Sequence, residues 1–70
     1  MPIVVTINGE RQELEEGTTV AHVLEARKIR PEVVSVELNN TILERNQYPA
    51  TVLQDGDALE FLFFMGGGCP

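Results

Sequence analysis

The chain has 70 residues, a formal charge of −6 at pH 7 and a hydrophobic fraction of 43%. We expect one domain, because this length is near the lower size at which a single core is self-sufficient. Eleven acidic against five basic residues argue against binding to nucleic acid or to an anionic membrane, and favour a basic protein partner. One cysteine excludes an internal disulfide.

The chain begins directly on a strand-like run, with no basic segment and no long apolar segment before it. No stretch approaches the length of a transmembrane helix. These features predict a cytoplasmic protein.

A β-hairpin is expected at the start of the chain. Residues 3–7 are all β-branched, which is typical of a strand. They are followed by Asn8-Gly9, a dipeptide that accepts the positive φ angles of a type I′ turn. The return strand, residues 10–14, is polar enough to lie at a solvated edge of a sheet.

One helix should follow the hairpin. Thr18 or Thr19 can cap its N-terminus, Lys28 and Arg30 suit its C-terminal end, and Pro31 should stop it. The apolar stripe runs along roughly three turns and begins with Val20, Val23 and Leu24. This stripe is expected to pack against a sheet.

A third strand and an irregular segment precede the last strand. Residues 34–38 alternate between apolar and polar, which predicts a half-buried strand. Residues 39–40 turn the chain into a short strand at 41–43, and residues 44–49 form a loop or a single helical turn. The side chains expected in the core here are Val34, Val36, Leu38, Val52 and Leu53.

The final strand, residues 58–65, follows a turn at 54–57 and is the most apolar stretch of the chain. Its near-continuous hydrophobicity predicts a central position, parallel to the first strand and buried on both faces. Alternation places Leu59, Phe61 and Phe63 on one side and Glu60, Leu62 and Phe64 on the other. If the helix covers only the first side, the second is an exposed docking patch. Alternatively, the loop around Tyr48 or a dimer partner covers it.

The order of the elements indicates an α+β fold, a mixed sheet of four to five strands with one main helix packed on one face. This order resembles the ubiquitin-like β-grasp fold. We expect that domain to span residues 1–65, with residues 66–70 as a flexible C-terminal tail, because glycines lose the most backbone entropy on ordering. The tail is either a probe that enters a site on another protein or a frayed end.

Nothing in the sequence supports an enzyme acting alone. The single histidine, His22, and the single cysteine, Cys69, would have to meet in space to form a nucleophile and base pair, although Cys69 lies on the tail. No second zinc ligand stands near His22. The glycine run leads into Cys-Pro and not into a phosphate-binding helix, so we expect no metal and no cofactor on this chain.

Two groups of motifs resemble the ThiS/MoaD family of ubiquitin-like sulfur carriers. Residues 54–61, Gln-Asp-Gly-Asp-Ala-Leu-Glu-Phe, followed by apolar residues and a glycine run, are similar to the C-terminal part of that family. Residues 7–10, Ile-Asn-Gly-Glu, and residues 17–20, Gly-Thr-Thr-Val, are similar to its thiamine-pathway branch. The similarity covers essentially the whole chain.

The resemblance implies a carrier on which partner enzymes act. An E1-like enzyme using ATP and magnesium would adenylate the carboxylate of Gly68, and a persulfide-bearing protein would supply the sulfur of a thiocarboxylate. The acceptor implied first is a thiazole synthase, while molybdopterin, cysteine, homocysteine or another thio-metabolite stays open as the product. The residues implied at the partner interface are Gly66 and Gly67 in the threaded tail, and Leu62, Phe64 and Glu60 in the docking surface.

The chain departs from the family pattern because Cys69-Pro70 follows Gly68 and blocks its carboxylate. Some relatives carry a short extension that a JAMM-type metallopeptidase removes, so the resemblance implies cleavage between Gly68 and Cys69. Alternatively, the Cys69 thiol itself acts, as a thioester or a persulfide. Two other functions stay open: a protein modifier joined through Gly68 to target lysines, and a binding module with a frayed end.

Overall fold

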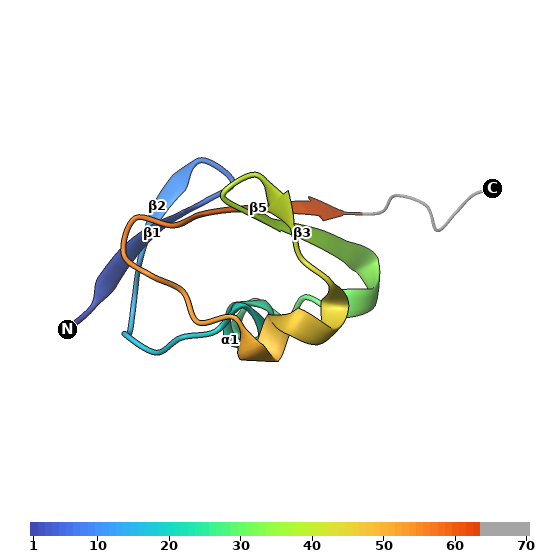
Figure 1. Ribbon diagram of the computed structural model, residues 1–70, viewed down its shortest axis with the longest axis horizontal. Coiled ribbons are helices and arrows are strands. Elements are labelled where there is room, and N and C mark those ends of the chain that lie inside the picture. The colour runs from blue at the N-terminus through green and yellow to red at the C-terminus, as the bar shows by residue number, and fades with distance from the viewer. Residues whose placement is uncertain (64–70) are drawn as a thin grey trace.

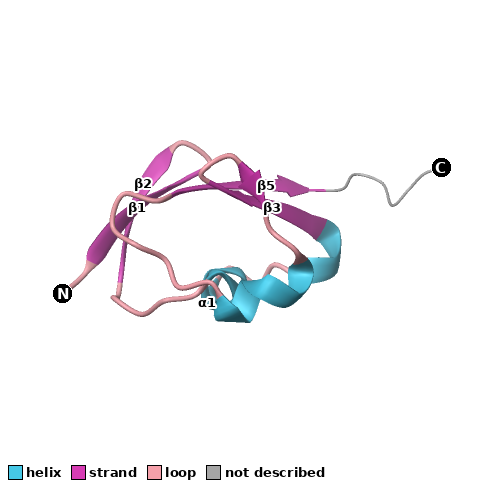
Figure 2. Ribbon diagram, viewed as in Figure 1, coloured by secondary structure: helices cyan, strands magenta, loops and turns pink. Residues whose placement is uncertain are grey.

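The computed structural model describes residues 1–63. A five-stranded sheet forms one layer and the helices form the other, as Figures 1 and 2 show. The strands are β1 (Ile3–Ile7), β2 (Glu10–Leu14), β3 (Val34–Leu38), β4 (Thr41–Ile42) and β5 (Ala58–Phe63). The helix is α1 (Val20–Ala26), joined by the 3₁₀ helices η1 (Pro31–Val33) and η2 (Arg45–Ala50). The predicted α+β arrangement, a mixed sheet with one main helix on one face, is confirmed.

The strand order is β2-β1-β5-β3-β4, so β5 lies at the centre of the sheet. It runs parallel to β1 and antiparallel to β3, as the sequence predicts for the parallel neighbour. The pairing with β1 covers only Ala58 and Leu59, whereas the pairing with β3 extends from Leu59 to Phe63. The second half of β5 therefore runs past the end of β1.

Two asparagine turns define the hairpins. Asn8 and Gly9 have φ angles of 50° and 85°, and Asn39 and Asn40 have φ angles of 52° and 71°. Two consecutive positive φ angles are the signature of a type I′ turn, whose twist matches that of the flanking strands. The turn predicted at Asn8-Gly9 is confirmed, and β2 lies at the edge of the sheet, also as predicted.

Helix α1 begins at a reciprocal cap. The Thr19 hydroxyl accepts a hydrogen bond from the backbone N–H of His22 at 3.1 Å, and His22 Nδ1 accepts one from the backbone N–H of Thr19 at 3.3 Å. Thr19, one of the two candidates, is thus the N-cap. His22 occupies the position where a capping box usually has Glu or Gln, which explains why the sequence pattern did not reveal its role.

Helix α1 ends earlier than the sequence predicts. Its seven residues make about two turns, not three. Lys28 adopts a φ of 59°, its N–H donates to the Glu25 carbonyl at 3.0 Å, and the Ile29 N–H donates to the Leu24 carbonyl at 2.9 Å. These two bonds form a Schellman motif with lysine at the position where glycine is usual. Pro31 therefore begins η1 and does not stop α1.

The core lies between the sheet and the helices. Its buried side chains are Ile3, Val5, Ile7, Val20, Val23, Leu24, Val34, Val36, Tyr48, Leu53, Leu59 and Phe61. Leu53 is 2% exposed, as predicted, but Val52 is 46% exposed and the prediction for it is wrong. Adjacent residues of an extended segment point in opposite directions, so only one of the two can reach the core. Within residues 1–63, no helix is long and apolar enough to cross a membrane.

Candidate functional site

The two faces of β5 have different surroundings. Leu59 and Phe61 face the helices and are 0% and 5% exposed, whereas Leu62 on the opposite face is 50% exposed and Glu60 is also exposed. The prediction that β5 is buried on both faces is therefore wrong, because the helices cover only one side of the sheet. Leu62 is also not covered by the loop around Tyr48, since η2 packs against α1.

Phe63 is 50% exposed although alternation places it on the helix side. It pairs with Val34 at the last position of β5, beyond the end of β1. Val34 is buried, but β1 no longer flanks β5 at this position, so the ring is only half covered. Figure 1 shows this end of β5 on the side of the molecule opposite the N-terminus.

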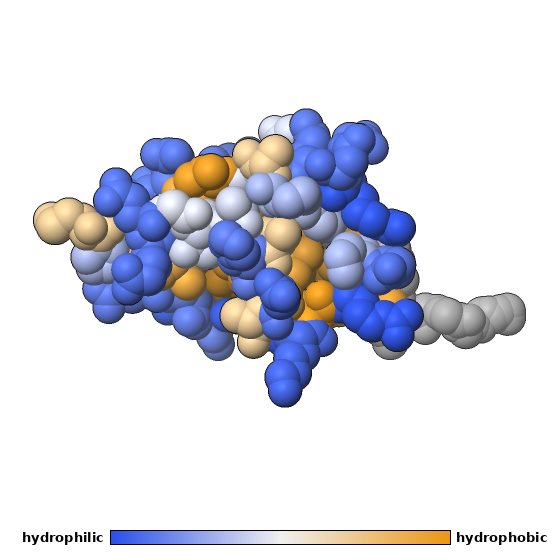
Figure 3. All heavy atoms as spheres, turned by 90° about the horizontal axis from the view of Figure 1, so that it is seen from below, coloured by the Kyte–Doolittle hydropathy of each residue, from blue (hydrophilic) through white to orange (hydrophobic). Residues whose placement is uncertain are grey.

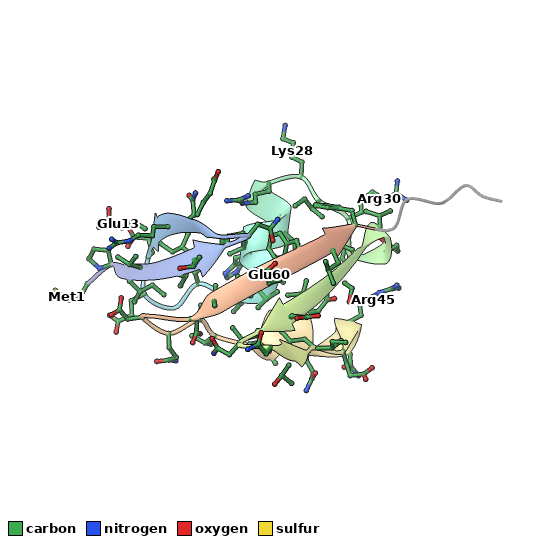
Figure 4. All side chains as sticks on the ribbon, turned by 90° about the horizontal axis from the view of Figure 1, so that it is seen from above. Met1, Glu13, Lys28, Arg30, Arg45 and Glu60 are labelled. Carbon is green, nitrogen blue, oxygen red and sulfur yellow. The ribbon has the colours of Figure 1, made fainter. Side chains whose placement is uncertain are left out.

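Four side chains, three of them exposed and Glu37 partly exposed, form a patch on the outer face of the sheet, which we call the outer patch. Glu60 of β5 pairs with Glu37 of β3, and Glu37 pairs in turn with Ile42 of β4. Leu62 lies two residues along β5 on the same face. Cross-strand partners share one face of a sheet, so Glu37, Ile42, Glu60 and Leu62 are neighbours. Figure 4 looks onto this face, with Glu60 in its middle.

The outer patch combines apolar surface with two adjacent carboxylates. Ile42 and Leu62 are 65% and 50% exposed. Like charges directly opposite each other in a sheet are destabilising. The salt bridges within residues 1–63 join Glu16 to the N-terminus and Arg30 to Glu32, so neither Glu37 nor Glu60 has a basic partner there. A partner with a Lys or Arg side chain and an apolar surface would complement this patch.

Two asparagine side chains fix β5 in place. The Phe61 N–H donates to Asn8 Oδ1 at 2.7 Å, which adds one rung to the ladder beyond the end of β1. The Ala58 N–H donates to Asn39 Oδ1 at 2.9 Å, and Asn39 Nδ2 donates to Asp57 Oδ1 at 3.1 Å. Sequence reasoning assigned both asparagines to turns and missed these contacts. The sequence signal for these contacts is an Asn at the first position of each turn, since an Asn side chain can hydrogen-bond backbone groups.

The remaining predicted site residues lie outside the described residues. They are Phe64 of the docking surface and Gly66, Gly67, Gly68 and Cys69 of the tail. The predicted domain boundary at residue 65 lies there too and stays a prediction. Of the predicted docking residues, the structure thus describes Leu62 and Glu60 and adds Glu37 and Ile42 beside them.

The part of the chain that the structure describes contains no candidate metal site. Residues 1–63 contain no group of three or more His, Cys, Asp or Glu side chains suited to a metal ion. His22 is exposed and uses its Nδ1 atom in the cap of α1.

The first and last strands, β1 and β5, pair in parallel in the middle of the sheet. Together with the crossover helix and the exposed outer face, this pairing defines a ubiquitin-like β-grasp domain. The ThiS family model matches residues 5–68, so the chain belongs to the ThiS family, the sulfur carriers that its motifs resemble. The crystal structure of the thiamine biosynthesis protein ThiS from Geobacter metallireducens superposes with a TM-score of 0.80 at 45% identity, covering 94% of this chain and 100% of that one. A solution structure of a thiamine biosynthesis protein from the same organism gives 0.76 at 44% identity, covering 97% and 91%. The predicted fold and family are confirmed.

Two curated relatives are larger proteins. Thiazole synthase of Magnetococcus marinus is 41% identical over 64 residues, and thiazole synthase of Paramagnetospirillum magneticum is 34% identical over 64 residues. The matches cover 91% of this chain but 20% of each synthase, so the chain spans about a fifth of their length. A relative of similar length, the uncharacterized protein ycf40 of Porphyra purpurea, is 29% identical over 94% of this chain and 93% of its own.

Proposed function

We propose that this protein carries sulfur for the synthesis of the thiamine thiazole, as a substrate of partner enzymes in the cytoplasm. The observation that carries the proposal is the ThiS family match, which extends from residue 5 to Gly68 and leaves Cys69-Pro70 outside. The likeness to the thiamine biosynthesis proteins of Geobacter metallireducens supports the pathway.

The proposed chemistry takes place at Gly68. A C-terminal carboxyl group has a pKa of about 3.5, so at pH 7 it is an anion and a poor electrophile. An E1-like enzyme that uses ATP and magnesium converts this carboxylate to an acyl adenylate. The outer sulfur of a persulfide-bearing protein then displaces AMP and forms an acyl disulfide between Gly68 and the donor cysteine. A second thiol attacks the donor cysteine sulfur of this disulfide, which forms a disulfide with the donor and releases the thiocarboxylate. The chain supplies the acyl group and its positioning, while the partners supply the reactive groups.

Removal of Cys69-Pro70 is part of the proposal. In the full chain the Gly68 carbonyl belongs to a peptide bond and has no free carboxylate to adenylate. A JAMM-type metallopeptidase that cleaves between Gly68 and Cys69 would release it. The end of the family match at Gly68 supports this division of the tail.

A thiazole synthase is the proposed acceptor enzyme. In two relatives bearing that name, a region similar to this chain makes up a fifth of a longer protein. Domains that are joined in one polypeptide in some organisms are natural partners as separate chains in others. The outer patch is the proposed docking surface, with Leu62 and Ile42 as apolar contacts and Glu37 and Glu60 facing basic side chains. Phe64 is proposed to extend it.

The test is a reconstituted reaction with two forms of the chain. The full chain and a chain ending at Gly68 are each incubated with the adenylating enzyme, ATP, magnesium, a persulfide donor and a thiol reductant, and intact mass is measured. We expect the chain ending at Gly68 to exchange one oxygen for one sulfur and the full chain to stay unchanged. Isopeptide adducts with lysines in place of the thiocarboxylate would instead identify a protein modifier.

A further inference from the structure

A shallow groove lies between α1 and η2, on the helix side of the molecule. Its volume is about 410 Å³, and its apolar walls come from Leu24, Ile29, Tyr48 and Pro49. Leu24 and Tyr48 are 2% and 4% exposed, so the floor of the groove is anchored in the core and its shape is fixed by packing. Figure 3 looks onto the helix side and shows apolar surface bordered by hydrophilic surface.

One arginine lines the groove, and a second is next to the lining in the chain. Arg45 is part of the lining, whereas Arg30 is not but stands between Ile29 and Pro31, which both are. Arg30 is 4.0 Å from Glu32, but the two side chains are 78% and 60% exposed. An ion pair that is so open to water contributes little, so both guanidinium groups remain available to a partner. Glu25 also lines the groove, so a bound carboxylate fits near the arginines and not along its whole length.

Charge is unevenly distributed over the chain. Four of the five basic residues lie between positions 27 and 45, namely Arg27, Lys28, Arg30 and Arg45. Of the eleven acidic residues, eight lie outside the segments 25–33 and 44–45 that carry these four. These segments thus carry four basic and three acidic residues, against one basic and eight acidic residues elsewhere, so an acidic partner is repelled least in this region.

The arginines also lie at the end of the molecule where β5 ends. Figure 4 shows Arg30 and Arg45 at that end and Met1 and Glu13 at the opposite end. Phe63, the last residue of β5, pairs with Val34 directly after η1. An enzyme that takes up the residues beyond β5 must sit against this end, within reach of both arginines.

We propose that the groove docks an acidic segment, carrying at least one apolar side chain, of the enzyme that takes up the C-terminal tail. This rests on the proposed function, and thiazole synthase is the partner used to test it. The apolar side chain replaces water over Leu24 and Tyr48, and the carboxylates pair with Arg30 and Arg45, whose planar groups suit carboxylates. The outer patch suits a basic surface, so the two contacts of opposite charge fix the orientation of the complex.

Charge reversal tests the electrostatic part. The chain ending at Gly68 and its Arg45→Glu and Arg30→Glu variants are titrated into thiazole synthase at low and high salt. The matched control is Arg11→Glu, which changes the net charge equally but lies on β2. We expect Kd to rise about fivefold or more for the groove variants at low salt, less at high salt, and less than about twofold for the control.

Two alanine-to-leucine variants test the apolar contact in the groove. Ala21 lines the groove, whereas Ala26 of the same helix does not. We expect Ala21→Leu to weaken binding at both salt concentrations, while Ala26→Leu leaves it unchanged and both variants keep the unfolding midpoint of the unaltered chain. Equal Kd values for groove and control variants would overturn the docking proposal alone. Failure of the unaltered chain to bind would overturn both this proposal and the proposed acceptor enzyme.

Discussion

The inner and outer faces of β5 carry alternate residues of one strand and differ in burial. Leu59 and Phe61 face inward and are almost fully buried, while Glu60 and Leu62 face outward and remain accessible. The inner side chains contribute to the free energy of folding through buried apolar area. The outer side chains cost some stability, since Glu60 lies opposite Glu37 and Leu62 exposes apolar surface. We propose that a partner uses this surface.

The largest expected effect is on the inner face. Phe61→Ala removes a ring that is 5% exposed from the middle of the core, and we expect a loss of about 3 to 5 kcal/mol in the free energy of unfolding. Urea denaturation followed by circular dichroism measures it. Leu62→Ala on the outer face is the matched change and should cost less than about 1 kcal/mol. Similar losses for both variants would contradict the distinction between the faces.

A smaller effect is expected where a turn holds the strand. Asn8→Ala leaves the partly buried Phe61 N–H without its acceptor and places a Cβ-bearing residue without a polar side chain at a φ of 50°. We expect a loss of about 1 to 3 kcal/mol. Asn8→Gly removes the acceptor but tolerates the φ angle, so it should cost less. If Asn8→Gly were as damaging as Asn8→Ala, strain would be irrelevant at this position.

The end of α1 offers a gain in stability away from both faces of β5. Lys28→Gly places the residue that suits a φ of 59° into the Schellman motif, and we expect a gain of about 0.5 to 1 kcal/mol in urea denaturation. Arg27→Gly is the control, because Arg27 has a φ of −93° and gains nothing from glycine. Stabilisation by the control would show that the φ angle is not the cause.

The smallest stability effect distinguishes the contribution of the outer face to stability from its proposed role in binding. Glu60→Gln removes the like-charge contact with Glu37, so the free energy of unfolding should rise by about 0.2 to 1 kcal/mol. The same change should weaken binding to thiazole synthase, with a reduced dependence on salt. Glu10→Gln on the edge strand β2 is the charge-matched control. A variant that is both more stable and equally well bound would remove Glu60 from the docking surface.

Local sequence patterns predicted most of the fold. β-branched runs, the Asn8-Gly9 turn and the alternation in residues 34–38 each depend on neighbours in the chain, and the structure confirms them. The errors come from contacts that such patterns do not contain. Burial of β5 on both faces requires two covering layers, and one helix supplies only one. The length of α1 was overestimated because a lysine in the left-handed region resembles an ordinary helical lysine in sequence.

The candidate site was predicted in part for the same reason. Alternation along β5 identified Glu60 and Leu62 as outward-facing, and both are exposed. Glu37 and Ile42 join them only through the pairing register of β3 with β5 and β4, which depends on the assembled sheet. The groove between α1 and η2 likewise joins residues from 21 to 49, so the role of Arg45 in it has no signal in the sequence.

Our central claim is that the protein is a sulfur carrier and that its sulfur is bound at the carboxyl group of Gly68. Intact-mass analysis of the protein recovered from its native cell tests it most directly. We predict a chain that ends at Gly68, with a fraction that carries sulfur in place of one terminal oxygen. Active, thiocarboxylated chains that retain Cys69-Pro70 would contradict the proposed processing, and chains joined to lysines with no thiocarboxylate would contradict the carrier function itself.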